Sequence, residues 1–144
     1  MATQTKQRLL GTGEASKLSG AQIGTIKKWC VVGIVSPVVD GQGKGTRRAF
    51  STLQILGLTY AQLFSRIGAT GELLKSIVDF FALRSPEKLA KELDAGNKFL
   101  LIDPSGRVKL VAAQAQEREL STLSVNVANQ YRKLLEDIAA IEKA

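Results

Sequence analysis

The feature that most constrains this fold is a pair of short helical patterns separated by a tight, glycine-containing turn. The first pattern covers residues 12–18 and the second covers residues 22–31. Gly20 lies between them and can adopt the positive φ that a tight turn needs. The second pattern repeats apolar residues on one helical face, at Ile23, Ile26, Trp29 and Cys30. Two short helices joined in this way predict a helix-turn-helix.

A wing is predicted directly after the two helices. Gly33 suits the end of the second helix, and the β-branched segment 34–39, which contains Pro37, is typical of a short edge strand. The glycine-rich segment 40–46 predicts a loop, and residues 47–50 predict the returning strand. Helical patterns follow over residues 51–67 and 70–81, and a short one begins at Ser85-Pro86.

The C-terminal part predicts a β-hairpin and a long helix. Two apolar segments flank Asp103-Pro104-Ser105-Gly106, a strong turn signal. From about residue 120 to the end, apolar residues recur at heptad-like steps, and such a seam must be buried either on the chain's own core or on a second subunit. We expect the second, a dimerisation seam. The seam consists of Leu120, Leu123, Val127, Tyr131, Leu134, Ile138 and Ile141.

These patterns predict a mainly α protein with two parts. Residues 1–82 are expected to form a winged helix-turn-helix domain that binds DNA. Residues 83–144 are expected to hold an accessory β-hairpin (98–112) and a dimerisation helix (120–144).

Charge is distributed very unevenly between the two halves. Residues 1–70 contain nine Lys and Arg residues but only two acids, so this segment carries the whole net charge of +7. Residues 71–144 contain eleven bases and eleven acids. A basic half joined to a neutral half is typical of a polyanion-binding module attached to an element with another role.

The residue inventory argues against an enzyme. The chain has no histidine, which removes the commonest general base and metal ligand, and its single cysteine cannot form an internal disulfide. Neither a phosphate-binding loop nor a nucleophile motif occurs in the sequence. We therefore expect no cofactor and no metal. Because no apolar run approaches the ~20 residues that span a bilayer, we expect no membrane association and a cytoplasmic protein.

Three segments, in order and at matching spacing, resemble the MerR family of transcriptional regulators. They are residues 12–37, with a TGEASKLSG stretch and then TIKKWCVVGIVSP, residues 45–51 (GTRRAFS), and residues 51–78, which include IGAT. The resemblance covers about half of the chain. It implies that the second helix enters the major groove and that the wing contacts the DNA backbone.

On this basis eight residues are expected to bind DNA. Gln22, Thr25 and Lys27, with Lys28 beside them, are expected to reach base edges, and Lys17, Arg47 and Arg48 to lie over phosphates. Lys44 lies at the expected wing tip.

This sequence also departs from the family pattern. Lys27 replaces an arginine of the family and Lys28 a tyrosine. Lysine lacks the bidentate fork of arginine, which weakens base readout. Trp29 shares the face of Ile26 and is expected to be a core anchor, and Cys30 is expected to be a small buried hydrophobe. The C-terminal half resembles neither the metal-sensing cysteine loops nor the drug-binding domains of that family.

The leading hypothesis is a homodimeric, sequence-specific transcriptional regulator of double-stranded DNA. The resemblance also implies RNA polymerase as a further partner, since such regulators distort promoter DNA. One alternative is a phage or mobile-element DNA-binding protein, such as an excisionase or small terminase subunit. Another is a protein-binding adaptor on the same fold, although an adaptor does not need +7 confined to residues 1–70.

Overall fold

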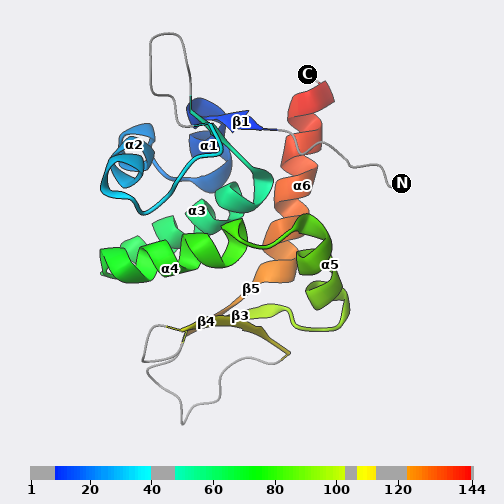
Figure 1. Cartoon of the computed structure of the whole chain (residues 1–144). Coiled ribbons are helices and arrows are strands. Elements are labelled where there is room, and N and C mark those ends of the chain that lie inside the picture. The colour runs from blue at the N-terminus through cyan, green and yellow to red at the C-terminus, as the bar shows by residue number, and fades with distance from the viewer. Residues whose placement is uncertain (1–8, 40–47, 103–106, 113–122, 144) are drawn as a thin grey trace. The chain divides into compact units, whose positions relative to one another are not determined.

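The chain is mainly helical, with two small antiparallel sheets. A computed structural model describes residues 9–39, 48–102, 107–112 and 123–143 (Figure 1). One sheet has two strands and the other three. The chain divides into two units, residues 1–82 and residues 83–144.

The first unit begins with two helices joined by a tight turn. Helix α1 spans Thr12–Ser19 and α2 spans Ile23–Val32, each within one residue of its predicted bounds. Gly20 closes α1 in the left-handed region at φ 84°, and its N–H donates to the Ser16 carbonyl at 3.0 Å. Gly33 ends α2 in the same conformation, at φ 86°. The two helix ends predicted from glycine are therefore confirmed.

Strand pairing after α2 differs from the prediction. Strand β2 (Ala49–Phe50) pairs antiparallel with β1 (Leu10–Gly11), with Leu10 opposite Phe50. The predicted strand over residues 34–39 is wrong, since only Val39 pairs, through an isolated bridge to Ala49. Pro37 has no N–H to donate, so this segment cannot extend a ladder. The predicted loop over residues 40–46 lies outside the described residues.

Helices α3 (Thr52–Ser65) and α4 (Gly71–Ala82) hold much of the first unit's core. A capping box starts α3, because Ser51 Oγ accepts from the Gln54 N–H and Gln54 Oε1 accepts from the Ser51 N–H, both at 3.1 Å. The helix ends two residues before the predicted Ile67. Tyr60 of α3 stacks on Phe81 of α4, with ring centroids 5.6 Å apart.

The α3 and α4 backbones approach closely at Gly57. A Cβ placed there would lie 3.0 Å from Val78 Cα and 3.3 Å from the Val78 carbonyl oxygen. Real Cβ atoms are rarely found so close to a neighbouring backbone. Only glycine therefore lets these two helices pack at this separation.

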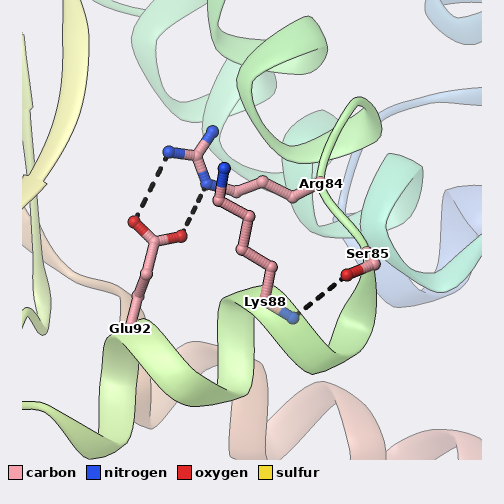
Figure 2. Close-up of polar contacts among 4 residues, drawn as sticks. All are labelled: Arg84, Ser85, Lys88 and Glu92. Atoms are coloured by element: carbon pink, nitrogen blue, oxygen red, sulfur yellow. Dashed lines mark hydrogen bonds and ion pairs between the residues drawn. The ribbon is translucent and has the colours of Figure 1, made fainter.

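The second unit begins with a helix held by a polar cap and an ion pair. Helix α5 spans Pro86–Asp94 and begins at the Ser-Pro pair as predicted, and Ser85 Oγ accepts from the Lys88 N–H at 3.1 Å. Figure 2 shows this bond together with the ion pair of Arg84 and Glu92. Arg84 Nε lies 2.8 Å from Glu92 Oε1, and both side chains are about three quarters buried. The pair links the segment that precedes α5 to the last turn of α5.

The predicted hairpin forms two strands of a three-stranded sheet. Strand β3 (Phe99–Ile102) pairs antiparallel with β4 (Val108–Val111), with Leu100 opposite Leu110. The turn predicted at 103–106 lies outside the described residues. Leu100 and Ile102 are buried on one face of the sheet.

The third strand corrects the predicted start of the last helix. Residues Leu123–Asn126 form strand β5, which pairs antiparallel with β3, and helix α6 spans only Val127–Lys143. Leu123 was predicted in the helical seam but lies opposite Ile102 in the sheet. Ser, Val and Asn are poor helix formers, and β3 offers them an open edge. Leu120 lies outside the described residues.

Candidate nucleic-acid interface

Helix α2 presents two lysines opposite its buried face. Ile26 and Trp29 lie inward, at 0% and 5% exposure, so the predicted core role of Trp29 is confirmed. Lys27 and Lys28 are exposed on the opposite side, as predicted for DNA-contacting side chains. Gly24 and Val31 have the helical spacing that places them on the same face, and both are exposed, so this face is basic at the lysine pair and apolar at Val31.

The other two predicted base-reading residues lie beside this face. Gln22 is the N-cap of α2, and Thr25 is half-buried, about 100° around the helix from Gly24. Both line a hollow between α2 and the C-terminal end of α3. Lys27 and Lys28 are not among the residues that line it, so the four predicted base-reading residues fall into two groups.

The hollow has a volume of about 230 Å³ and a lining of both polar and apolar surface. The α1–α2 turn and α2 contribute Gln22, Thr25 and Trp29, and α3 contributes Gln62 and Ser65, followed by Arg66. With its amide oxygen turned toward Arg66, Gln62 accepts from Arg66 Nε at 2.7 Å and from Nη2 at 2.8 Å.

Sequence reasoning missed the α3 side of this hollow. Arg66 is one of the nine bases of residues 1–70, but its position in the sequence indicated only that it belongs to the helical pattern that became α3. Gln62 and Ser65 carry no motif. They lie beside α2 only because of the way α3 packs, and a local sequence pattern does not reveal such tertiary packing.

The remaining predicted DNA contacts are only partly described. Lys17 is exposed in the last turn of α1. Arg48 is half-buried, and its Nε is buried with no hydrogen-bond partner among the described residues. Lys44 and Arg47 lie outside the described residues.

Cys30 is half-buried rather than fully buried, which corrects the expectation for this residue. Its place on the edge of the inward face of α2, one position past Trp29, accounts for the partial exposure. The described part of the chain has no cluster of three or more Cys, Asp or Glu residues that could hold a metal ion.

The predicted dimerisation seam on α6 is mostly covered within the single chain. Val127, Leu134 and Ile138 are 0%, 2% and 7% exposed, and Tyr131 and Ile141 are half-buried. Burial raises the pKa of Tyr131, with Glu87 adding to the effect. Leu135, outside the predicted seam, is 45% exposed. A dimer through this helix would therefore rely on Leu135 and the half-buried residues.

Comparison with known proteins adds no relative. No protein-family model matches the chain, and no curated protein matches it. Within the described ranges, no helix combines the length and apolar character needed to cross a bilayer.

Proposed function

We propose that this chain is a sequence-specific regulator that binds double-stranded DNA as a homodimer. The observation that carries the proposal is the exposed lysine pair on α2, directly opposite the buried Ile26 and Trp29. A short helix that is buried on one face and carries exposed lysines on the other is suited to bind a polyanion.

The arrangement of α1, α2 and the short strands supports a winged helix-turn-helix. An α-helix with its side chains is about 10–12 Å wide and fits the major groove, which is about 12 Å wide. The tight turn at Gly20 fixes α1 against α2, so α1 can lie across the backbone while α2 enters the groove. Strand β2 and the Val39 bridge would form the base of the wing.

Within this proposal, the two lysines and Gly24 have different roles. Lys27 reads base acceptors in the groove, and Lys28 contacts a phosphate at its edge. Gly24 leaves open space at the helix surface, where a Cβ would meet no atom within 4 Å. The helix backbone can therefore approach the bases closely at this position.

Duplex selection followed by affinity measurement tests the proposal. Selection from a random duplex pool is expected to return a palindromic motif, because a two-fold dimer reads two half-sites. Fluorescence anisotropy on that motif should then show a loss of at least about tenfold for the double variant Lys27→Ala with Lys28→Ala.

A charge-matched double variant in the other unit serves as the control. Lys91 and Lys98 are exposed in the second unit, and Lys91→Ala with Lys98→Ala removes the same charge. This control is expected to keep near wild-type affinity. Equal losses in the two double variants would mean that α2 is not the reading element, and an unenriched pool would contradict sequence-specific binding.

A further inference from the structure

The hollow beside α2 has the features of a site for a compact anion. It is bounded by three elements: the α1–α2 turn, α2 and the end of α3. Its volume of about 230 Å³ is enough for a small ion with several waters, because one water needs only ~10–15 Å³ of such space. The described residues that line it include one arginine and no acid.

Arg66 is oriented by its neighbour on α3. Gln62, one helical turn earlier, accepts from Arg66 Nε and Nη2 and so fixes the guanidinium plane. A guanidinium has five N–H donors, so two bonds to Gln62 leave its outer edge for another acceptor. None of the ion pairs found among the described residues uses Arg66.

The other walls supply neutral donors rather than competing charges. Thr25 and Ser65 carry hydroxyl groups, and Gln22 carries an amide. The Gln22 side chain makes no capping hydrogen bond to a described residue, so the first turn of α2 keeps its backbone N–H groups facing outward. An oriented arginine with hydroxyl and amide donors matches the oxygens of a phosphate group.

We propose that this hollow binds a phosphate group, with Arg66 as its principal ligand and Ser65 and Thr25 as supporting donors. The assignment of that phosphate to the backbone of a duplex rests on the proposed function. It would give the protein a backbone contact beside α2, in addition to the contact proposed for Lys28. Gln22 and Thr25 would then help to hold the backbone rather than read bases.

Trp29 makes the test direct, because it is the only tryptophan in the sequence and it lines the hollow. In one arm, inorganic phosphate is titrated against chloride at constant ionic strength while Trp29 fluorescence is recorded. In the other arm, duplex affinity is measured by anisotropy over a range of salt concentrations. Each arm uses the full-length wild-type chain and its variants.

Arg66→Gln is expected to weaken phosphate or duplex binding about tenfold, since it removes a charge-assisted hydrogen bond. It should also reduce the log–log salt slope for duplex by about one per subunit. Ser65→Leu places an apolar side chain in the hollow while keeping both Arg66 and Gln62, and it should give a similar loss. Arg132→Gln removes an exposed arginine of α6 and is expected to change neither arm.

The outcomes separate this inference from the proposed function. An effect of Arg66→Gln and Ser65→Leu in either arm supports the site, and the arm that responds identifies free or backbone phosphate as the source. If the chain bound phosphate but no duplex, the result would support the phosphate site and contradict the proposed function. Unchanged binding by both variants in both arms would overturn the site, even where Lys27→Ala still weakens duplex binding.

Discussion

At the scale of single residues, Gly24 and Gly57 lie in helices but in opposite surroundings. A Cβ at Gly24 would meet no atom within 4 Å, whereas a Cβ at Gly57 would lie 3.0 Å from the backbone of Val78. Glycine weakens a helix by about 0.5–1 kcal/mol relative to alanine, so substitution by alanine measures whether the surroundings of each glycine require it.

The two glycines predict opposite changes in stability. Gly24→Ala should raise the free energy of unfolding by about 0.5–1 kcal/mol, because it adds helix propensity without a clash. Gly57→Ala should lower it by about 1–3 kcal/mol, because α3 and α4 must move apart. Urea unfolding monitored by circular dichroism measures both. If Gly57→Ala were as stable as wild type, the close packing of α3 and α4 would be wrong.

Lys27 and Arg48 are expected to differ in their effect on specificity. Lys27→Ala should cost about 1–3 kcal/mol on the preferred duplex and less on random duplex, because it removes a base contact. Arg48→Ala should weaken both duplexes about equally, because it removes a phosphate contact. Competition anisotropy with the two duplexes gives both values. Identical behaviour of the two variants would contradict the role given to α2.

At the scale of elements, local sequence signals predicted the helix ends well. Gly20 and Gly33 adopt the left-handed conformation that their positions indicated, and α5 begins at the Ser85-Pro86 pair as predicted. These signals work because a cap or a tight turn depends on residues within a few positions of one another.

Elements that depend on distant partners were missed. Strand β5 pairs with β3, about 24 positions earlier in the chain, and its residues continue the apolar spacing of the following helix. Strand β1 likewise needs β2, across the whole of α1 and α2. The hollow was missed for the same reason, since α3 supplies Arg66 and the α1–α2 turn supplies Gln22.

Two neighbouring leucines of α6 test which face of this helix is buried. Leu134 is 2% exposed and Leu135 is 45% exposed. Leu134→Ala should lower the free energy of unfolding by about 2–5 kcal/mol through lost burial and a cavity. Leu135→Ala should cost about 0.5 kcal/mol or less when unfolding is measured at concentrations low enough to keep the chain monomeric, since Leu135 lies at the surface of the single chain. Chemical denaturation of both variants checks this, and equal losses would contradict the buried face.

At the scale of the whole molecule, the charge asymmetry predicts strong salt dependence. Six basic residues are assigned to the DNA surface, Lys27 in the groove and the others on the backbone. If all six displace counterions from the duplex, the log–log slope of duplex affinity against salt should be on the order of −5 per subunit. These residues are Lys17, Lys27, Lys28, Lys44, Arg47 and Arg48. Anisotropy at several salt concentrations measures the slope. A slope near −1 would contradict the assignment of these residues to the DNA interface.

The proposed homodimer predicts a concentration-dependent assembly. Sedimentation velocity at micromolar concentration should show a dimer, because a palindromic site needs two recognition helices about one DNA turn apart. Leu134→Asp with Ile138→Asp would unfold part of the chain, since both residues are already buried in it.

Leu135→Glu is the sharper variant, and it is expected to shift the equilibrium toward monomer while keeping the circular dichroism spectrum. Leu83→Glu, at a leucine that is 84% exposed outside α6, is the matched control and should leave the dimer intact. A wild-type chain that sediments as a monomer would contradict the homodimer.

The order of the three-stranded sheet has a consequence for the nascent chain. Strand β3, with the sequence Phe-Leu-Leu-Ile, is central, and the strand that covers one of its edges, β5, is synthesised last. Until residue 126 has left the ribosome, that apolar edge is open to pairing with another chain. Truncation before residue 123 is therefore expected to give a product that aggregates or is degraded, even though the whole of the first unit has been made.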